Sequence, residues 1–462
     1  MEHMAAGYVR PTGRLDVASA LEPYAGPWDE RFAAHLLRRA GFGGSPDDVA
    51  RVARMRPHDA VESLIHPPDT SSLSAPDVMP YPAMFRRDAA KDLRRSAVES
   101  IVDLQNWWLN RMLSTPAPLQ EKMTFILHGH FTTAAIEKGV WPNLIYEQNQ
   151  LLRSYAFGNL HDLTLAISQD PAMLLYLDNA ENNKSHPNEN YARELMELFT
   201  LGLGNYSEED VRQSARSFTG WSIDRRTGEF FDNPRTHDDG VKTFLYRSGN
   251  FSGADIVDII YRQRACERFW ASALLSAFVY NDPEPSLIDA YADVISRNRF
   301  ELRPSLSVLL ESKVFYSPRG YRGLVKSPVE FAVGAHKSLG LTEIMEGTPA
   351  RLRSMGQTLF HPPNVAGWPG GQNWLTTQML IARENYALRL VHSPGTDASP
   401  WLAAVPGDPQ EAARKLIVTI LQNDASNGAH AHLAGYLDGT ASSSRIRNAA
   451  YLTMAMPAYQ LG

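Results

Sequence analysis

The stretch "NENYARELMELF", residues 188–199, combines charged side chains with a row of large apolar ones. On a helix, Tyr191, Leu195, Leu198, Phe199 and Gly202 share one stripe, which predicts a face buried in the core. A second stripe is polar and consists of Glu189, Asn190, Arg193, Glu194 and Glu197. Because its three carboxylates meet only one guanidinium, this stripe must face water or find cations or protons elsewhere.

Neighbouring carboxylates can acquire separated pKa values, so that one site holds both an acid and a base near pH 7. We therefore expect Glu194 to act as general acid or base, with His130 as its partner and Arg193 fixing charge on a substrate. The alternative is a structural ion network, in which Arg212 and Arg216 of the following helix approach Glu194.

A histidine extends a second helical pattern, "EKMTFILHGHFTT". His130 continues its apolar stripe, whereas His128 lies about 200° away around the helix. We expect His130 to point inward. A core histidine satisfied by one hydrogen bond is the alternative to a reactive one.

Two further polar clusters lie on turns or loops. "RTHDDGVK" supplies His237, Asp238 and Lys242, on the kind of scaffolded loop where reactive groups concentrate; a plain turn is the alternative. "LFHPPNVAGWPGGQNW" supplies the remaining candidate substrate-binding residues, which are His361, Asn364, Trp368 and Trp374. Its aromatic side chains are typical of loops that stack on sugars, or of loops that plug a core.

These clusters come from four parts of the chain, and we expect them to line one pocket. Each buried polar group without a partner costs about 1–3 kcal/mol, so one shared network is favoured over four separate burials. The predicted pocket residues are His130, Glu189, Asn190, Arg193, Glu194, His237, Asp238, His361 and Asn364.

Apolar residues at three- and four-residue spacing dominate the chain. This pattern predicts a mainly α protein, a large irregular multi-helix array with one small β-hairpin inserted at residues 228–246. We expect an N-terminal extension over 1–28, a main helical domain over 29–395 and a C-terminal helical extension over 396–462 packed on it.

Composition excludes several classes of protein. The 462 residues are 44% apolar, and their formal net charge of -6 gives no basic field for nucleic acid. The single cysteine, Cys266, excludes an intrachain disulfide and a cysteine-built metal cage. No run of about 18 apolar residues and no leader pattern occurs, which predicts no membrane span and a cytoplasmic location. Compact signatures such as HExxH, GxSxG, the P-loop and GxGxxG are absent.

The chain resembles a large bacterial family known as domain of unknown function 1800, over about residues 30–395. The motifs that carry the resemblance are "HLLRRAGFG", "HGHFTT", "DPAMLLYLDN", "NENYARELMELFTLGLGNYSEEDVRQSARSFTGW", "HDDGVKTF", "KSPVEF" and "LFHPPNVAGWPGGQNW". Leu127 replaces a tryptophan that is commoner there, so His130 is the histidine carried over. The resemblance implies a mainly helical fold and a sulfatase-like partner encoded nearby, and it implies no established reaction.

Three functions are therefore expected. The first is a hydrolase or lyase that acts on a carbohydrate or related polar polymer by Glu/His acid–base catalysis, without a cofactor. The second is a metal-dependent hydrolase or oxidoreductase, with a divalent metal on His130, Glu194 and His237. The third is a non-catalytic accessory or scaffold whose aromatic loop docks the sulfatase-like partner.

Overall fold

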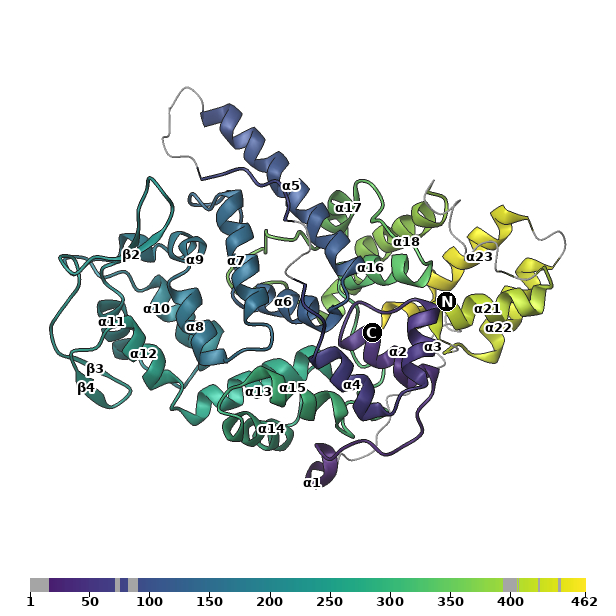
Figure 1. Ribbon diagram of the computed structural model, residues 1–462, viewed down its shortest axis with the longest axis horizontal. Coiled ribbons are helices and arrows are strands. Elements are labelled where there is room, and N and C mark those ends of the chain that lie inside the picture. Colours follow the sequence, from purple (N-terminus) through teal and green to yellow (C-terminus); the bar gives the residue numbers. More distant parts are fainter. Residues whose placement is uncertain are drawn as a thin grey trace.

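Helices account for most of the chain, which confirms the mainly α prediction. The computed structural model describes residues 16–70, 75–81, 90–393, 405, 407–422, 424–438 and 442–462. Parts of the expected N-terminal extension (1–15) and of the 396–404 boundary region lie outside the described residues. Figure 1 shows an elongated arrangement, with the β-strands at one end and α21–α23 at the other.

The helices before the strands are α1 (Val17–Ala20), α2 (Glu30–Arg39), α3 (Pro46–Ala53), α4 (Pro57–Ile65), α5 (Ala90–Ser114), α6 (Pro118–His130), α7 (Pro142–Ser154), α8 (Leu160–Ser168), α9 (Pro171–Tyr176), the 3-10 helix η1 (Asn179–Glu181), α10 (Asn190–Glu194), the π-helix η2 (Leu195–Thr200) and α11 (Glu208–Ser217). Those after the strands are α12 (Gly253–Ile260), α13 (Arg264–Phe278), α14 (Pro285–Arg297), α15 (Leu302–Glu311), α16 (Pro328–Ser338), α17 (Thr348–Ser354), η3 (Gly371–Leu375), α18 (Thr377–Val391), α21 (Pro409–Leu421), α22 (Asn427–Leu437), α23 (Ser443–Ala455) and η4 (Pro457–Gln460).

Local sequence fixes many of the helix starts. Ser45, Ser207, Ser252 and Ser327 each cap a helix, and the acidic residue three positions later bonds back to complete a capping box. These reciprocal bonds satisfy N–H groups that the first helical turn leaves without partners.

The strands form two hairpins where one was predicted. β1 (Trp221–Ile223) pairs with β2 (Phe230–Asp232), and β3 (Lys242–Phe244) pairs with β4 (Arg247–Gly249), both antiparallel. The expected single hairpin over 228–246 is therefore wrong in its extent. The second hairpin turns at Leu245 and Tyr246, which both have positive φ, and no glycine marks this turn in the sequence.

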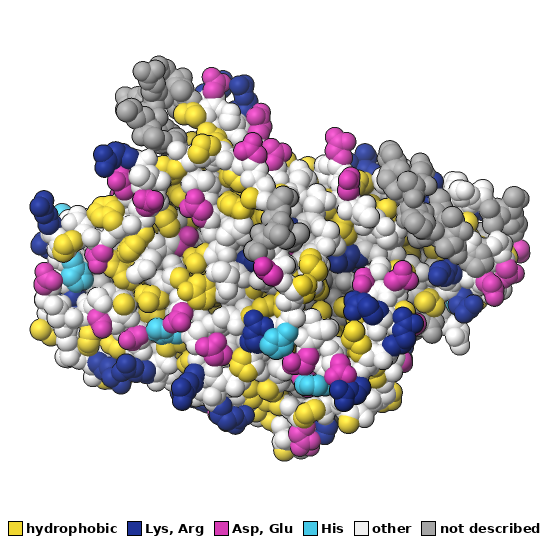
Figure 2. Space-filling view, viewed as in Figure 1, with side chains coloured by type: hydrophobic (Ala, Val, Ile, Leu, Met, Phe, Trp, Pro, Cys, Tyr) yellow, Lys and Arg dark blue, Asp and Glu magenta, His cyan; other side chains and the backbone are white. Residues whose placement is uncertain are grey.

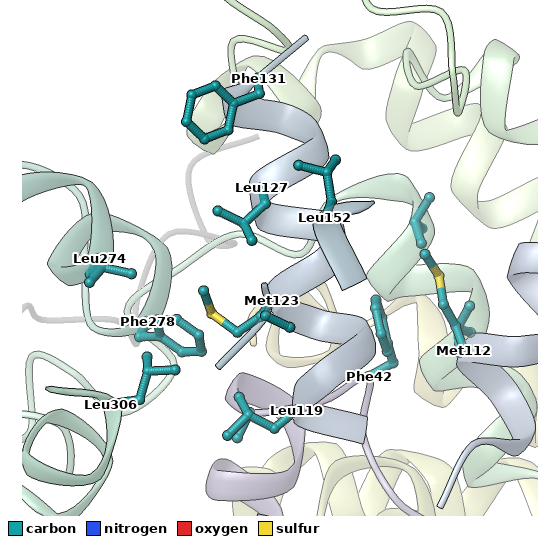
Figure 3. Packing of buried hydrophobic residues seen from close by; sticks show 14 of the residues in the cluster. Phe42, Met112, Leu119, Met123, Leu127, Phe131, Leu152, Leu274, Phe278 and Leu306 are labelled. Atoms are coloured by element: carbon teal, nitrogen blue, oxygen red, sulfur yellow. The ribbon is translucent and has the colours of Figure 1, made fainter. Parts of the chain in front are cut away.

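Helix α6 runs through the centre of the core (Figure 3). Its Leu119, Met123 and Leu127 are fully buried, and Figure 3 shows them beside Phe278 of α13, with Phe42 on another side of the helix. The free thiol of Cys266, also on α13, is buried.

The C-terminal helices pack on the main array. α23 contacts α18, and α21 contacts α16. The chain then returns to α2, where Figure 1 places its C-terminal end, and Gly462 N donates to Leu324 O at 2.9 Å.

On the face in Figure 2, basic and acidic side chains are interspersed, as the composition predicts. Among the described residues, every helix is too short or too polar to cross a bilayer.

Candidate functional site

The predicted polar stripe lies at the surface of α10. Arg193 donates to both carboxylate oxygens of Glu208, at 2.7 and 2.8 Å, and to Glu189 at 3.1 Å. Arg212 and Arg216 pair with Glu209 and Asp238, so they do not approach Glu194 as expected. Arg193 is therefore held in a largely exposed ion network with Glu189 and Glu208, whose members differ from those of the network expected from the sequence.

Glu194 differs from its neighbours. Among the described residues no hydrogen bond or ion pair reaches its half-buried carboxylate. Burial and the charge of Glu197 raise its pKa, which Arg193 lowers in part. Burial and, to a smaller extent, the charges of Glu137 and Glu194 raise the pKa of Tyr176, so both carboxylates lie within electrostatic reach of Tyr176.

Two of the predicted residues, His361 and Asn190, lie near the loop at residues 136–140. His361 Nε2 lies 3.7 Å from Glu137 Oε1, and Lys138 Nζ lies 2.7 Å from Asp178 Oδ2. Asn190 Nδ2 donates to the same Asp178 oxygen at 3.1 Å. His361 and Asn190 thus lie on the two sides of one loop, and both are exposed.

His130 is turned inward, as predicted, but its partner is backbone. Its Nε2–H donates to Phe199 O in η2 at 3.0 Å, and burial lowers its pKa to about 4. His128, expected on the opposite side of the helix, is more deeply buried: its Nε2 accepts from Phe360 N at 3.2 Å. The opposite side of α6 is also covered, because Phe360 packs against His128 with ring centroids 5.3 Å apart.

The turn cluster has structural partners. His237 Nδ1–H donates to Thr219 O at 2.7 Å, and Asp238 accepts two hydrogen bonds from Arg216, at 2.7 and 3.1 Å. The ammonium of Lys242 is fully engaged: it donates to Asp238 O, to Asn250 Oδ1 at 3.2 Å and to Phe251 O at 2.9 Å. Lys242 therefore ties β3 to its surroundings.

In the aromatic loop, Asn364 is exposed and its Oδ1 accepts from Ala366 N at 3.0 Å. Trp368 packs on His128, with ring centroids 5.6 Å apart. The predicted residues thus fall into separate networks: among the described residues, no hydrogen bond or ion pair joins His130 to the α10 stripe or to the His237 turn.

The alternative metal ligands are not brought together. Their ligand atoms do not lie within 4.8 Å of one another, whereas those of His58, Glu62 and Glu311 do. These three come from α4 and from the end of α15, and His58 is exposed. They form the one histidine and carboxylate group in the described part of the chain that could hold a metal ion.

A cavity of about 190 Å³ lies elsewhere, where six segments of the chain meet. Its lining includes Arg38 and Arg39 at the end of α2, Lys326 just before α16, and Trp374 in η3. Three of the motifs quoted from the sequence therefore converge here: "HLLRRAGFG", "KSPVEF" and the end of "LFHPPNVAGWPGGQNW". Of the predicted substrate-binding residues, Trp374 is the one that lines this cavity.

Gly370 and Gly371 shape the wall beside Trp374. Both have positive φ, at 62° and 56°, a conformation that side-chain-bearing residues rarely adopt. A Cβ on Gly371 would come within 3.1 Å of the amide of Asn281, which also lines the cavity. Gly371 thus lets the loop approach Asn281, in the segment after α13, closely.

The cavity is rich in buried positive charge. Arg38 is 8% exposed and donates from Nη1 to Gln422 Oε1 at 2.5 Å, while its Nε and Nη2 have no hydrogen-bond partner among the described residues. Burial and nearby Arg322 lower the pKa of Arg38 to about 10, which leaves it charged at neutral pH. Arg39 donates to the carbonyls of Val279 and Gly320, at 3.0 and 3.1 Å.

Carboxylates compensate this charge only in part. Glu330 lines the cavity, but it bonds Lys122 and accepts from Ser327 N at 2.7 Å. Asp424 pairs with Arg322. Neither carboxylate bonds Arg38.

Sequence reasoning missed this site because its residues are far apart in the chain and follow no local spacing. An indication was present in "HLLRRAGF", where two arginines directly follow the apolar part of a helix. Positions of that kind are buried in the structure, and a buried arginine needs a partner.

Comparison with known proteins places the chain in a family. No curated protein and no solved structure matches it. The family match extends beyond the expected limit near residue 395 and includes the C-terminal helices. The chain belongs to the family described as "Protein of unknown function (DUF1800)", which it matches over residues 35–461.

Proposed function

We propose that the protein binds a small molecule bearing an oxyanion, a carboxylate or a phosphate, in the cavity lined by Arg38 and Lys326. The observation that carries this proposal is the guanidinium of Arg38, which is buried and has two nitrogens without acceptors.

An anion in the cavity would compensate the buried charge of Arg38. A buried cation without a counter-charge is unfavourable, because burial removes its hydration. A guanidinium presents a planar fork of donors that matches carboxylate and phosphate oxygens. An oxyanion at Nε and Nη2 of Arg38 would satisfy both nitrogens.

The rest of the lining suits an organic anion. Phe42, Trp374 and Tyr459 provide aromatic surface, and Ser276 and Asn281 add neutral polar groups. Aromatic side chains pack well against apolar or sugar-like portions of a ligand. An acidic sugar or a small organic acid fits this chemistry.

Titration calorimetry with phosphate, sulfate, acetate and glucuronate tests the proposal. We expect at least one of these anions to bind, and Arg38→Gln to weaken it by about tenfold or more, equivalent to about 1.4 kcal/mol. Arg51→Gln, on the exposed face of α3, is the matched control and should leave affinity unchanged. Absence of binding by the native protein, or equal affinity in both variants, would refute the proposal.

A second candidate function is the acid–base chemistry expected at Glu194 on a saccharide. It is supported by the raised pKa of Glu194 and by the absence of a partner for its carboxylate. In a screen of saccharides, Glu194→Gln should abolish any turnover, whereas Glu411→Gln, at the exposed start of α21, should retain it. If Glu194→Gln retains activity, as the control variant should, Glu194 is not the catalytic acid or base.

The accessory role beside a sulfatase-like partner stays a prediction. Asn364 is an exposed position in the aromatic loop expected to dock the partner. If the loop is the docking surface, Asn364→Arg should prevent co-purification with that partner. Unchanged co-purification would exclude the loop.

A further inference from the structure

We infer that Lys326 is an amine nucleophile, which forms an imine with the carbonyl group of an anionic aldehyde or keto acid held in the same cavity. This inference rests on the proposed binding of an anion and names its substrate class. It also assigns a covalent step to a residue for which the sequence suggested no role.

The backbone of Lys326 is firmly placed. Its N–H donates to Gln460 O at 2.9 Å, and its carbonyl accepts from Arg383 Nη2 at 2.7 Å. The side chain is 7% exposed and lines the cavity. Nζ lies 3.6 Å from the centre of the Tyr459 ring, and among the described residues it has no hydrogen-bond acceptor.

The two other lysines that are buried in the described part of the chain differ in this respect. Lys242 has three oxygen acceptors, and Lys122 is paired with Glu330. An ammonium held in this way is stabilised in its charged form and is not a nucleophile. Among the described residues, Lys326 Nζ has no oxygen acceptor of this kind; it lies over the Tyr459 ring, and the residue lines the cavity.

The surroundings favour the neutral amine. Burial lowers the pKa of Lys326 well below its ordinary value, and Arg38, Arg322 and Arg383 lower it further against a smaller opposing effect of Glu330. A lysine desolvated beside other cations is the arrangement that activates an amine for imine formation.

The reaction balances without a co-reactant. The lone pair of Nζ attacks the carbonyl carbon, and a C–N bond forms. Both protons of the amine then leave with the carbonyl oxygen as one water molecule, which gives a C=N double bond to Nζ. Arg38 would hold the anionic group of the same molecule and so orient its carbonyl toward Lys326.

Reductive trapping tests this inference. The native protein is incubated at neutral pH with glyoxylate and cyanoborohydride, which reduces an imine to a stable secondary amine, and the labelled lysines are mapped by peptide mass spectrometry. We expect label at Lys326 to exceed that at exposed Lys313 by about tenfold or more, since each unit of lowered pKa gives about tenfold more neutral amine. Lys242 should remain unlabelled.

Three controls sharpen the test. Propionaldehyde, which lacks the anionic group, should label Lys326 less than glyoxylate does at the same concentration, because Arg38 cannot hold it. Inorganic phosphate should compete with glyoxylate. Arg38→Gln should reduce labelling by glyoxylate, and circular dichroism confirms that the variant is folded.

Uniform labelling of exposed lysines, with Lys326 labelled no faster, would overturn the inference. If calorimetry still shows binding of an anion that depends on Arg38, anion binding stands and the covalent step alone fails. If neither labelling nor Arg38-dependent binding occurs, both proposals fail.

Discussion

Arg38 is held by the side-chain amide of Gln422 and not by a carboxylate. Its Nη1 donates to Gln422 Oε1 at 2.5 Å. The Gln422 amide is itself oriented, because Nε2 donates to Thr419 O and Ile420 O at the end of α21, both at 3.2 Å. A neutral partner fixes the guanidinium in place and leaves its charge available for a ligand.

Gln422→Glu tests this relationship. The new carboxylate would pair with Arg38 inside the protein, so the variant should lose anion affinity by about tenfold or more and melt at an equal or higher temperature. Gln410→Glu adds the same charge at the exposed start of α21 and should leave affinity unchanged. Equal affinity in the native protein and Gln422→Glu would show that Arg38 does not bind the anion.

Glu121→Gln tests a purely structural cluster. Glu121 is fully buried and accepts hydrogen bonds from Arg111, from Arg153 and from Trp108. Burial alone would raise its pKa, but the hydrogen bonds and charges of Arg153 and Arg111 hold that pKa below its usual value. Removal of this charge leaves two buried guanidiniums uncompensated and should lower the free energy of unfolding by about 3–5 kcal/mol, measured by urea denaturation.

The control for that variant is Glu208→Gln, which removes an exposed partner of Arg193. It should change stability little, since exposed ion pairs contribute little. Similar losses in the two variants would contradict the assignment of Glu121 as a buried counter-charge.

The two histidines of α6, His128 and His130, predict a loss of stability in acid. Burial lowers the pKa of His128 to about 3 and that of His130 to about 4, against an ordinary value of 6.5. Above pH 6.5 both groups are neutral in the folded and unfolded states. As pH falls from 6.5 towards 4, only the unfolded chain takes up these protons, so each histidine costs up to about 1.4 kcal/mol per pH unit.

Urea denaturation across this pH range measures the effect. His128→Gln keeps an acceptor for Phe360 N–H and should show a shallower loss of stability between pH 6.5 and 4 than the native protein. His186→Gln, at an exposed position, is the control for loss of one histidine. Identical slopes in all three proteins would mean that His128 does not stay neutral in the fold.

Much of the fold follows from local sequence. Apolar spacing predicts the helices, and most of the predicted stripe is buried: Tyr191, Leu195 and Phe199 are fully buried, whereas Leu198 and Gly202 are only partly buried. The 3.6-residue period of an α-helix does not hold along this stripe, because the helix changes to a π-helix at Leu195. The helix propensities of these residues do not predict that change. The second hairpin was missed because its turn residues, Leu245 and Tyr246, are not turn formers.

The candidate site was less accessible to sequence reasoning. The polar cluster "RTHDDGVK" looks like a reactive site in the sequence. In the structure, Lys242 donates a hydrogen bond to the carbonyl of Asp238, so these residues belong to a local structural network. Arg38 and Lys326 lie in apolar contexts nearly three hundred positions apart, and only tertiary packing brings them to one cavity. The excess of buried cations over carboxylates at this cavity can be recognised only when the hydrogen-bond partners in the folded protein are known.

The most direct measurement is a crystal structure of the protein soaked with selenate, whose selenium atom is located by its anomalous scattering. We expect an anomalous peak in the cavity, with selenate oxygens within about 3 Å of Arg38 Nε or Nη2, and no such peak in crystals of Arg38→Gln. Selenate bound only at exposed lysines and arginines, with the cavity beside Arg38 and Lys326 free of anomalous density, would show that Arg38 does not form an anion site.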